Sequence, residues 1–168
     1  MPTETVVGLV AGKTGLSRLF EIKGRDLDKP IALLCGSTEE AFGWSREVPP
    51  LARFLADRFW PGPLTLVLDA QDGTVGVRVP AHPVARAVLA GYGEPLHATS
   101  ANLSGEPAPR TLEGVNPVVS AAVDFAVRGE PGSGEASAVV DLSGREVRVL
   151  RPTGEITEER LWRLAAEV

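Results

Sequence analysis

The sequence LTLVLDAQDGTVGVRV at residues 64–79 decides the fold class. Residues 64–68 and 75–79 are rich in apolar and β-branched side chains, which favour strands. Asp72-Gly73 lies between them and is a typical turn sequence. The stretch therefore predicts two antiparallel strands joined by a short turn, with Arg78 as a cation within the second strand.

Further strands and helices are predicted on both sides of this hairpin. The expected strands cover residues 5–10, 30–35, 124–127, 138–142 and 147–150, and the last two form a second hairpin turned at Ser143-Gly144. The expected helices cover residues 16–22, 38–42, 50–59, 83–90, a part of 112–123, and 157–166. Hairpins mixed with helices predict an α/β fold with a twisted sheet of parallel and antiparallel strands and flanking helices.

The composition is typical of one globular domain covering residues 1–168. No apolar stretch is long enough to span a membrane, and the first residues do not form a signal peptide, so we expect no membrane partner. Cys35 is the only cysteine, which excludes an internal disulfide and indicates a cytoplasmic protein. The net charge of −5 excludes a polycation that coats nucleic acid, although local basic clusters remain possible sites for phosphate or RNA.

Metal binding by the protein itself is not expected. Two histidines, His82 and His97, and Cys35 are too few for a typical structural zinc site. Any metal ion would therefore arrive with a phosphate ligand.

The loop Thr99-Ser100-Ala101-Asn102-Leu103-Ser104-Gly105 is a candidate site. It offers three hydroxyls, one amide and a glycine after a short apolar run, which is the pattern of a strand that opens into an ordered loop. Polar loops on a rigid scaffold often carry binding residues. The same residue types also favour ordinary turns, so the loop alone does not separate the two interpretations.

Cations recur beside glycine and proline turns. They are Lys23 and Arg25 around Gly24, Arg78 before Val79-Pro80, and Arg151 before Pro152. Hydroxyl-rich segments accompany them at residues 3–5, 99–104 and 133–137. If these segments converge, they would bind a polyanion together with a carboxylate-bearing partner, because arginine grips both groups through two hydrogen bonds. The alternative is that each arginine makes a surface ion pair of little consequence.

Five motifs follow one another in the order known from one protein family. They are PTETVVGL at residues 2–9, FEIKGR at 20–25, FWPGPLTL at 59–66, VRVP at 77–80 and SANLSG at 100–105, with weaker echoes at 137–141 and 150–152. Through these motifs the chain resembles the YrdC family, the catalytic domain of threonylcarbamoyl-AMP synthase. The resemblance implies a twisted α/β sheet with an open concave face that holds the site.

The resemblance also implies a reaction. L-threonine, bicarbonate and ATP, with Mg²⁺ carried by the nucleotide, condense to threonylcarbamoyl-adenylate and pyrophosphate. The product serves the threonylcarbamoyl modification of adenosine in tRNA, so partner proteins of tRNA modification are expected, and the family is associated with double-stranded RNA. Carbamate formed on the threonine amine would attack the α-phosphorus in line.

The motifs assign expected roles to individual residues. Thr5, Arg78 and Ser137 would bind threonine. The ATP-binding set would be Lys23, Arg25, Thr74, Ser100, Asn102 and Arg151, of which Lys23 and Arg25 would be the catalytic cations. No residue is expected to bind a metal or to act as a strong base, because the carbamate oxygen is already a nucleophile.

Some positions depart from the family pattern. A helix and a strand usually precede the Pro-Thr-x-Thr motif, which here begins at Pro2. Val7, Leu34 and Ala138 stand where tyrosine, histidine and threonine are usual. Two further functions therefore stay open: a non-catalytic module that binds double-stranded RNA or a nucleotide, and a carbamoyl-adenylate enzyme with another acceptor.

Overall fold

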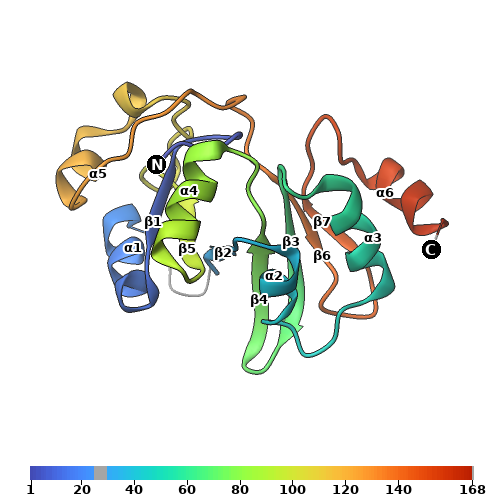
Figure 1. Ribbon diagram of the computed structural model, residues 1–168. Coiled ribbons are helices and arrows are strands. Elements are labelled where there is room, and N and C mark those ends of the chain that lie inside the picture. Colours follow the sequence, from blue (N-terminus) through green and yellow to red (C-terminus); the bar gives the residue numbers. More distant parts are fainter. Residues whose placement is uncertain (25–29, 168) are drawn as a thin grey trace.

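The sheet is mixed and has seven strands in the computed structural model, which describes residues 1–24 and 30–167 (Figure 1). The strands are β1 (Gly8–Ala11), β2 (Ala32–Leu34), β3 (Leu64–Ala70), β4 (Gly73–Arg78), β5 (Leu96–Ser100), β6 (Ala138–Asp141) and β7 (Arg148–Arg151). Their order in the sheet is β1-β5-β2-β4-β3-β6-β7, and β2–β4 and β3–β6 are the parallel pairs. The sheet is open, and the predicted fold class is confirmed.

The hairpin predicted at residues 64–79 forms between β3 and β4. Its antiparallel register pairs Leu66 with Val77 and Ala70 with Gly73. Both strands extend further toward the turn than the apolar pattern predicted. The second predicted hairpin also forms, since β6 and β7 pair antiparallel around residues 143–144.

Three strand predictions need correction. Residues 5–7 precede β1, because the Thr3 hydroxyl donates to the carbonyl of Val6 and holds this segment in a bend. The strand predicted at 30–35 shortens to Ala32–Leu34. Residues 124–127 form no strand within the described part of the chain. This segment and β1 both line a cavity of about 570 Å³, and among the described strands β1 is an edge strand that pairs with β5.

Helices cover the sheet, and they agree closely with the predicted ranges. They are α1 (Leu16–Lys23), α2 (Thr38–Phe42), α3 (Pro50–Phe59), α4 (Pro83–Tyr92), α5 (Pro117–Ala122) and α6 (Glu158–Ala165), with short 3₁₀ turns η1 (Lys13–Gly15) and η2 (Leu112–Gly114). Gly24 ends α1 in the left-handed conformation with φ 57°, which glycine adopts cheaply. Helix α5 begins only at Pro117, because a residue before proline avoids the helical region.

Strand alternation sends apolar and polar side chains to opposite faces of the sheet. Leu64, Leu66 and Val77 are fully buried in the core under α2, α3 and α6. Their neighbours Thr65 and Arg78 therefore point to the other face. On that face α4 packs through Ala85 and Leu89 against Leu34 of β2 and Leu96 of β5, while β3 and β4 present the polar side chains of Thr65 and Arg78.

None of the helices in the described residues is long and apolar enough to cross a membrane.

Candidate functional site

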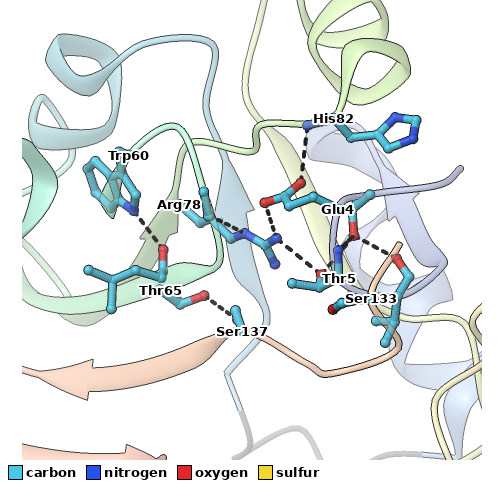
Figure 2. Close-up of polar contacts among 12 residues, drawn as sticks. Glu4, Thr5, Trp60, Thr65, Arg78, His82, Ser133 and Ser137 are labelled. Atoms are coloured by element: carbon cyan, nitrogen blue, oxygen red, sulfur yellow. Dashed lines mark hydrogen bonds and ion pairs between the residues drawn. The ribbon is translucent and has the colours of Figure 1, made fainter. Parts of the chain in front are cut away.

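Arg78 is the central cation of the polar face. It ends β4, and its side chain is only 8% exposed. Its Nε donates to the carbonyl of Gly62 at 3.1 Å, and its Nη2 donates to Glu4 Oε1 at 2.5 Å and to Thr5 Oγ1 at 3.1 Å (Figure 2). Nη1 has no partner among the described residues and is not a buried unpaired atom, so this edge of the guanidinium faces solvent.

Glu4 is held from two sides. Its Oε1 binds Arg78, while its Oε2 accepts from the backbone N–H of His82 at 3.2 Å, just before α4 (Figure 2). Burial raises the pKa of Glu4, but attraction to Arg78 and the hydrogen bonds outweigh burial and bring that pKa below its ordinary value. The carboxylate therefore stays ionised at neutral pH.

Two threonine hydroxyls complete this side of the site. The Oγ1 atoms of Thr3 and Thr5 lie 2.8 Å apart, and both side chains are buried. Thr5 Oγ1 thus contacts both Thr3 and Arg78. The structure brings together Thr5 and Arg78, the two residues that the sequence assigned to the same substrate.

A second group of polar side chains lies next to Arg78 on the same face of the sheet. Thr65 in β3 lies one register step from the Leu66–Val77 pair, which places it beside Arg78. Its Oγ1 lies 2.9 Å from Ser137 Oγ (Figure 2). Arg151 donates from Nε to the carbonyl of Ser137 at 2.6 Å and from Nη2 to Ser137 Oγ at 3.1 Å. Ser137 therefore lies between Thr65 and Arg151.

A third group forms where α1 meets the end of β5. Lys23 Nζ donates to the carbonyls of Ser100 at 2.6 Å and Asn102 at 2.8 Å, and lies 3.3 Å from Asn102 Oδ1. The Lys23 side chain is buried, so in this conformation it fixes the loop that follows β5. Ser100 and Asn102 are thus brought together with Lys23, another residue of the expected ATP-binding set.

The two remaining residues of the predicted site are Thr74 and Arg25. Thr74 is exposed at the turn end of β4, four residues before Arg78, which is about 13 Å along a strand. Arg25 lies outside the described residues, so the structure does not place it.

A glycine-rich segment crosses the polar face, and we name residues 129–137 the strap. Ser133 N donates to the carbonyl of Glu4, and Gly134 N donates to the carbonyl of Thr5. A side chain at Gly132 would put its Cβ 2.5 Å from the carbonyl oxygens of Thr3 and Thr5, so only glycine fits there. The strap therefore fixes the Pro2–Thr5 segment and ends at Ser137.

Several of these residues were missed from the sequence. No spacing in the sequence singles out Glu4, Thr65 or His82, because the residues that they contact lie on other strands and loops. Glu4 was visible only as part of the Pro-Thr-Glu-Thr motif. The strap was visible only through the hydroxyl-rich segment at residues 133–137.

The 570 Å³ cavity is a separate feature. Apolar residues of β1, α1, α4 and α5 form most of its wall, and its charged residues Arg18 and Asp124 are 3.5 Å apart and pair with each other. Such a wall does not suit a polyanion. The polar face is the better candidate site, because its cationic and hydroxyl groups converge.

The described residues contain no group of three or more His, Cys, Asp or Glu side chains that could hold a metal ion. A magnesium ion that is bound mainly by the phosphate oxygens of a nucleotide needs no such group.

Comparison with known proteins adds a family match and close relatives. The Sua5_yciO_yrdC family model, described as telomere recombination, matches residues 1–153. Threonylcarbamoyl-AMP synthase of Pyrococcus abyssi is 38% identical over 172 residues, covering 94% of this chain and 51% of the relative. A putative threonylcarbamoyl-AMP synthase of Mycobacterium tuberculosis is 38% identical over 175 residues, covering 96% of this chain and 80% of the relative. The chain therefore spans about half the length of the first relative.

Solved structures show the same fold. Pyrococcus abyssi Sua5 complexed with L-threonine matches with a TM-score of 0.89 and 35% identity, over 99% of this chain and 53% of that chain. Escherichia coli YciO matches with a TM-score of 0.78 and 25% identity, over 89% of this chain and 80% of that chain. The first of these structures binds the amino acid that the sequence motifs implied.

Proposed function

This chain belongs to the Sua5, YciO and YrdC family, and from that membership we propose that it is a threonylcarbamoyl-AMP synthase. It condenses L-threonine, bicarbonate and ATP to threonylcarbamoyl-adenylate and pyrophosphate, as a nucleotidyltransferase. One observation carries the proposal: Arg78 presents a free Nη1 edge beside the Thr5 hydroxyl, in a chain similar to a threonine-bound relative.

The threonine side of the site is Thr5, Arg78 and Ser137. Nη1 of Arg78 binds the substrate carboxylate, because a guanidinium and a carboxylate form strong charge-assisted hydrogen bonds. The hydroxyls of Thr5 and Ser137 are held by Arg78 and Thr65, and they bind the remaining polar atoms of the amino acid. The buried partners fix these side chains before the substrate arrives.

The nucleotide side is the loop of Ser100 and Asn102 together with Arg151. Lys23 holds the loop through its contacts to both residues. We propose that Lys23 and Arg25 stabilise charge that develops on the phosphates, while Thr74 contributes a more distant nucleotide contact. ATP enters as its magnesium complex, and no step is assigned to a metal held by the protein.

The chemistry requires little acid–base catalysis by side chains. The threonine amine and bicarbonate give the carbamate and water. A carbamate oxygen then forms a bond to the α-phosphorus of ATP, the bond from that phosphorus to the bridging oxygen breaks, and pyrophosphate leaves. The protein contributes mainly position and electrostatic stabilisation.

We further propose that the chain acts as one domain in tRNA modification in the cytoplasm, with modification partners that consume the adenylate. Binding to double-stranded RNA would bring the protein close to the tRNA that is modified. Steep dependence of RNA retention on salt is the expected signature, since phosphate contacts release counterions.

The test is incubation with L-threonine, bicarbonate, ATP and Mg²⁺, with pyrophosphate and the adenylate measured. Product that depends on threonine and bicarbonate supports the synthase. Turnover with another amino acid but not threonine indicates a different acceptor. RNA binding with no turnover on any amino acid indicates a non-catalytic module and rejects the proposal.

A further inference from the structure

One carboxylate, Glu4, controls the orientation of Arg78. Glu4 Oε1 accepts from Arg78 Nη2, and Glu4 Oε2 accepts from His82 N, so it ties together both ends of the connection between β4 and α4 (Figure 2). Gly62 holds the Nε edge of the guanidinium. With two edges fixed, Nη1 is the edge that a ligand can reach.

Glu4 itself has little freedom to move away. Its backbone carbonyl accepts from Ser133 N at 2.9 Å, and Gly132 of the strap lies against the carbonyls of Thr3 and Thr5. The Glu4 side chain is 20% exposed, and its partner Arg78 is 8% exposed. Its negative charge is therefore a fixed part of the site and is only weakly screened by solvent.

The Glu4–Arg78 ion pair determines which ligand charge the site favours. Arg78 and Glu4 together carry no net charge, so a ligand carboxylate at Nη1 meets an arginine that is already neutralised. A simple carboxylate adds an uncompensated negative charge close to Glu4. An amino acid brings its own ammonium group, which compensates that charge and is attracted to Glu4.

We propose that Glu4 is a specificity-determining residue: by neutralising and orienting Arg78, it makes the site prefer a zwitterionic amino acid to a carboxylate that lacks the amino group. The inference rests on the proposed function, in which Arg78 binds the carboxylate of the substrate. It assigns a role to the carboxylate that lies between Thr3 and Thr5 in this chain.

The test compares the dissociation constants of L-threonine and (R)-3-hydroxybutanoate, which keeps the carboxylate and hydroxyl of threonine but lacks the ammonium. Calorimetry on the whole protein and on Glu4→Gln gives the ratio of the two constants. We expect the preference for threonine to fall by about tenfold or more in Glu4→Gln, because its amide keeps the shape but loses the charge. A general loss of order at Arg78 would raise the dissociation constants of both ligands by a similar factor, so it would cancel in their ratio.

Two further variants control the comparison. Glu113→Gln removes a carboxylate that pairs with Arg128 on the surface, where both side chains are largely exposed, and the ratio should not change. Glu4→Asp keeps the charge with a shorter reach, so both ligands should bind more weakly at a nearly unchanged ratio. A ratio in Glu4→Gln equal to that of the unmodified protein overturns the inference.

The unmodified protein provides a test that needs no variant. If it binds the two ligands equally, Glu4 exerts no selection and the inference is wrong. Failure of the proposed function is seen separately, as absence of threonine-dependent pyrophosphate. Turnover with an unchanged ratio in Glu4→Gln rejects only the inference, whereas a shifted ratio without turnover rejects only the synthase activity.

Discussion

Arg151 and Ser137 are joined by two hydrogen bonds, from Nε to the serine carbonyl at 2.6 Å and from Nη2 to the serine hydroxyl at 3.1 Å. The same hydroxyl lies 2.9 Å from Thr65 Oγ1. Ser137 thus connects Arg151, which we assign to the nucleotide, with Thr65, which lies beside Arg78. Changes at this serine are expected to affect both substrates.

Ser137→Ala tests that link. The substitution removes the hydroxyl shared by Thr65 and Arg151, and we expect the KM values for threonine and ATP each to rise by about threefold to tenfold, with a stability loss of about 1 kcal/mol. Steady-state kinetics and thermal unfolding give both quantities. Ser143→Ala, in the β6–β7 turn, is the matched control for kinetics. A rise in only one KM would contradict a linking role.

Arg78→Lys tests the carboxylate assignment. Lysine keeps the charge but loses the planar fork that bonds Gly62, Glu4 and Thr5 at once. We expect the KM for threonine to rise by about tenfold or more, while the KM for ATP changes by less than about twofold. Arg128→Lys, at an 85% exposed arginine, should change neither. An equal loss for both substrates would show that Arg78 does not act on the amino acid alone.

Lys23→Met tests the loop that follows β5. Methionine has a similar length but leaves the carbonyls of Ser100 and Asn102 without their donor. We expect a stability loss of about 1–3 kcal/mol and a weaker affinity for ATP. Denaturant unfolding and nucleotide titration measure these effects, with the exposed Lys13→Met as the control. Unchanged ATP affinity in a folded Lys23→Met would remove Lys23 from the nucleotide site.

Gly132→Ala tests the packing of the strap. The added Cβ would lie 2.5 Å from two backbone carbonyl oxygens, which cannot move independently of the Pro2–Thr5 segment. We expect a loss of about 2 kcal/mol or more in the free energy of unfolding and weaker threonine binding. Gly144→Ala meets nothing within 4 Å and serves as the control. Equal stability of the two variants would mean that the strap does not pack as described.

The pH dependence of stability tests the Glu4–Arg78 pair. The pKa of Glu4 is lower in the folded chain than its ordinary value, because attraction to Arg78 and the hydrogen bonds to the carboxylate outweigh the effect of burial. A lowered folded pKa gives stability that is complete above the unfolded pKa and is lost as the pH falls through the folded pKa. Glu4→Gln lacks this contribution.

The free energies of unfolding of the unmodified protein and Glu4→Gln should therefore converge as the pH falls from neutral to below about 4. Urea unfolding at a series of pH values measures the difference. Gly144→Ala, which removes no titratable group, should show a nearly constant difference. A gap for Glu4→Gln that stays constant or widens on acidification would show that the carboxylate is not stabilised by Arg78.

Local patterns in the sequence predicted the elements well. Helix α3 begins and ends at the predicted residues, since an apolar stripe with Pro50 at its start specifies it without distant contacts. Strand boundaries were less predictable. Residues 124–127 are mostly apolar and were predicted as a strand, but strand formation needs a hydrogen-bonded neighbour, and in the described part of the chain this segment joins no sheet.

For the site, the sequence pointed to Thr5, Arg78, Ser137 and Arg151 through motif order. It did not point to Glu4 or Thr65, whose decisive contacts span 74 and 72 residues of chain. Nothing in a local pattern reveals which distant cation a carboxylate will meet.

The sequence by itself determined the α/β class, the two hairpins and the residue types able to bind an amino acid and a nucleotide, because periodicity and turn chemistry act over a few residues. Only the tertiary structure decided that Glu4 neutralises Arg78, that Ser137 joins Thr65 to Arg151, and that Lys23 is enclosed by the loop after β5. These contacts depend on strand order and register, which place side chains from distant parts of the chain on one face of the sheet.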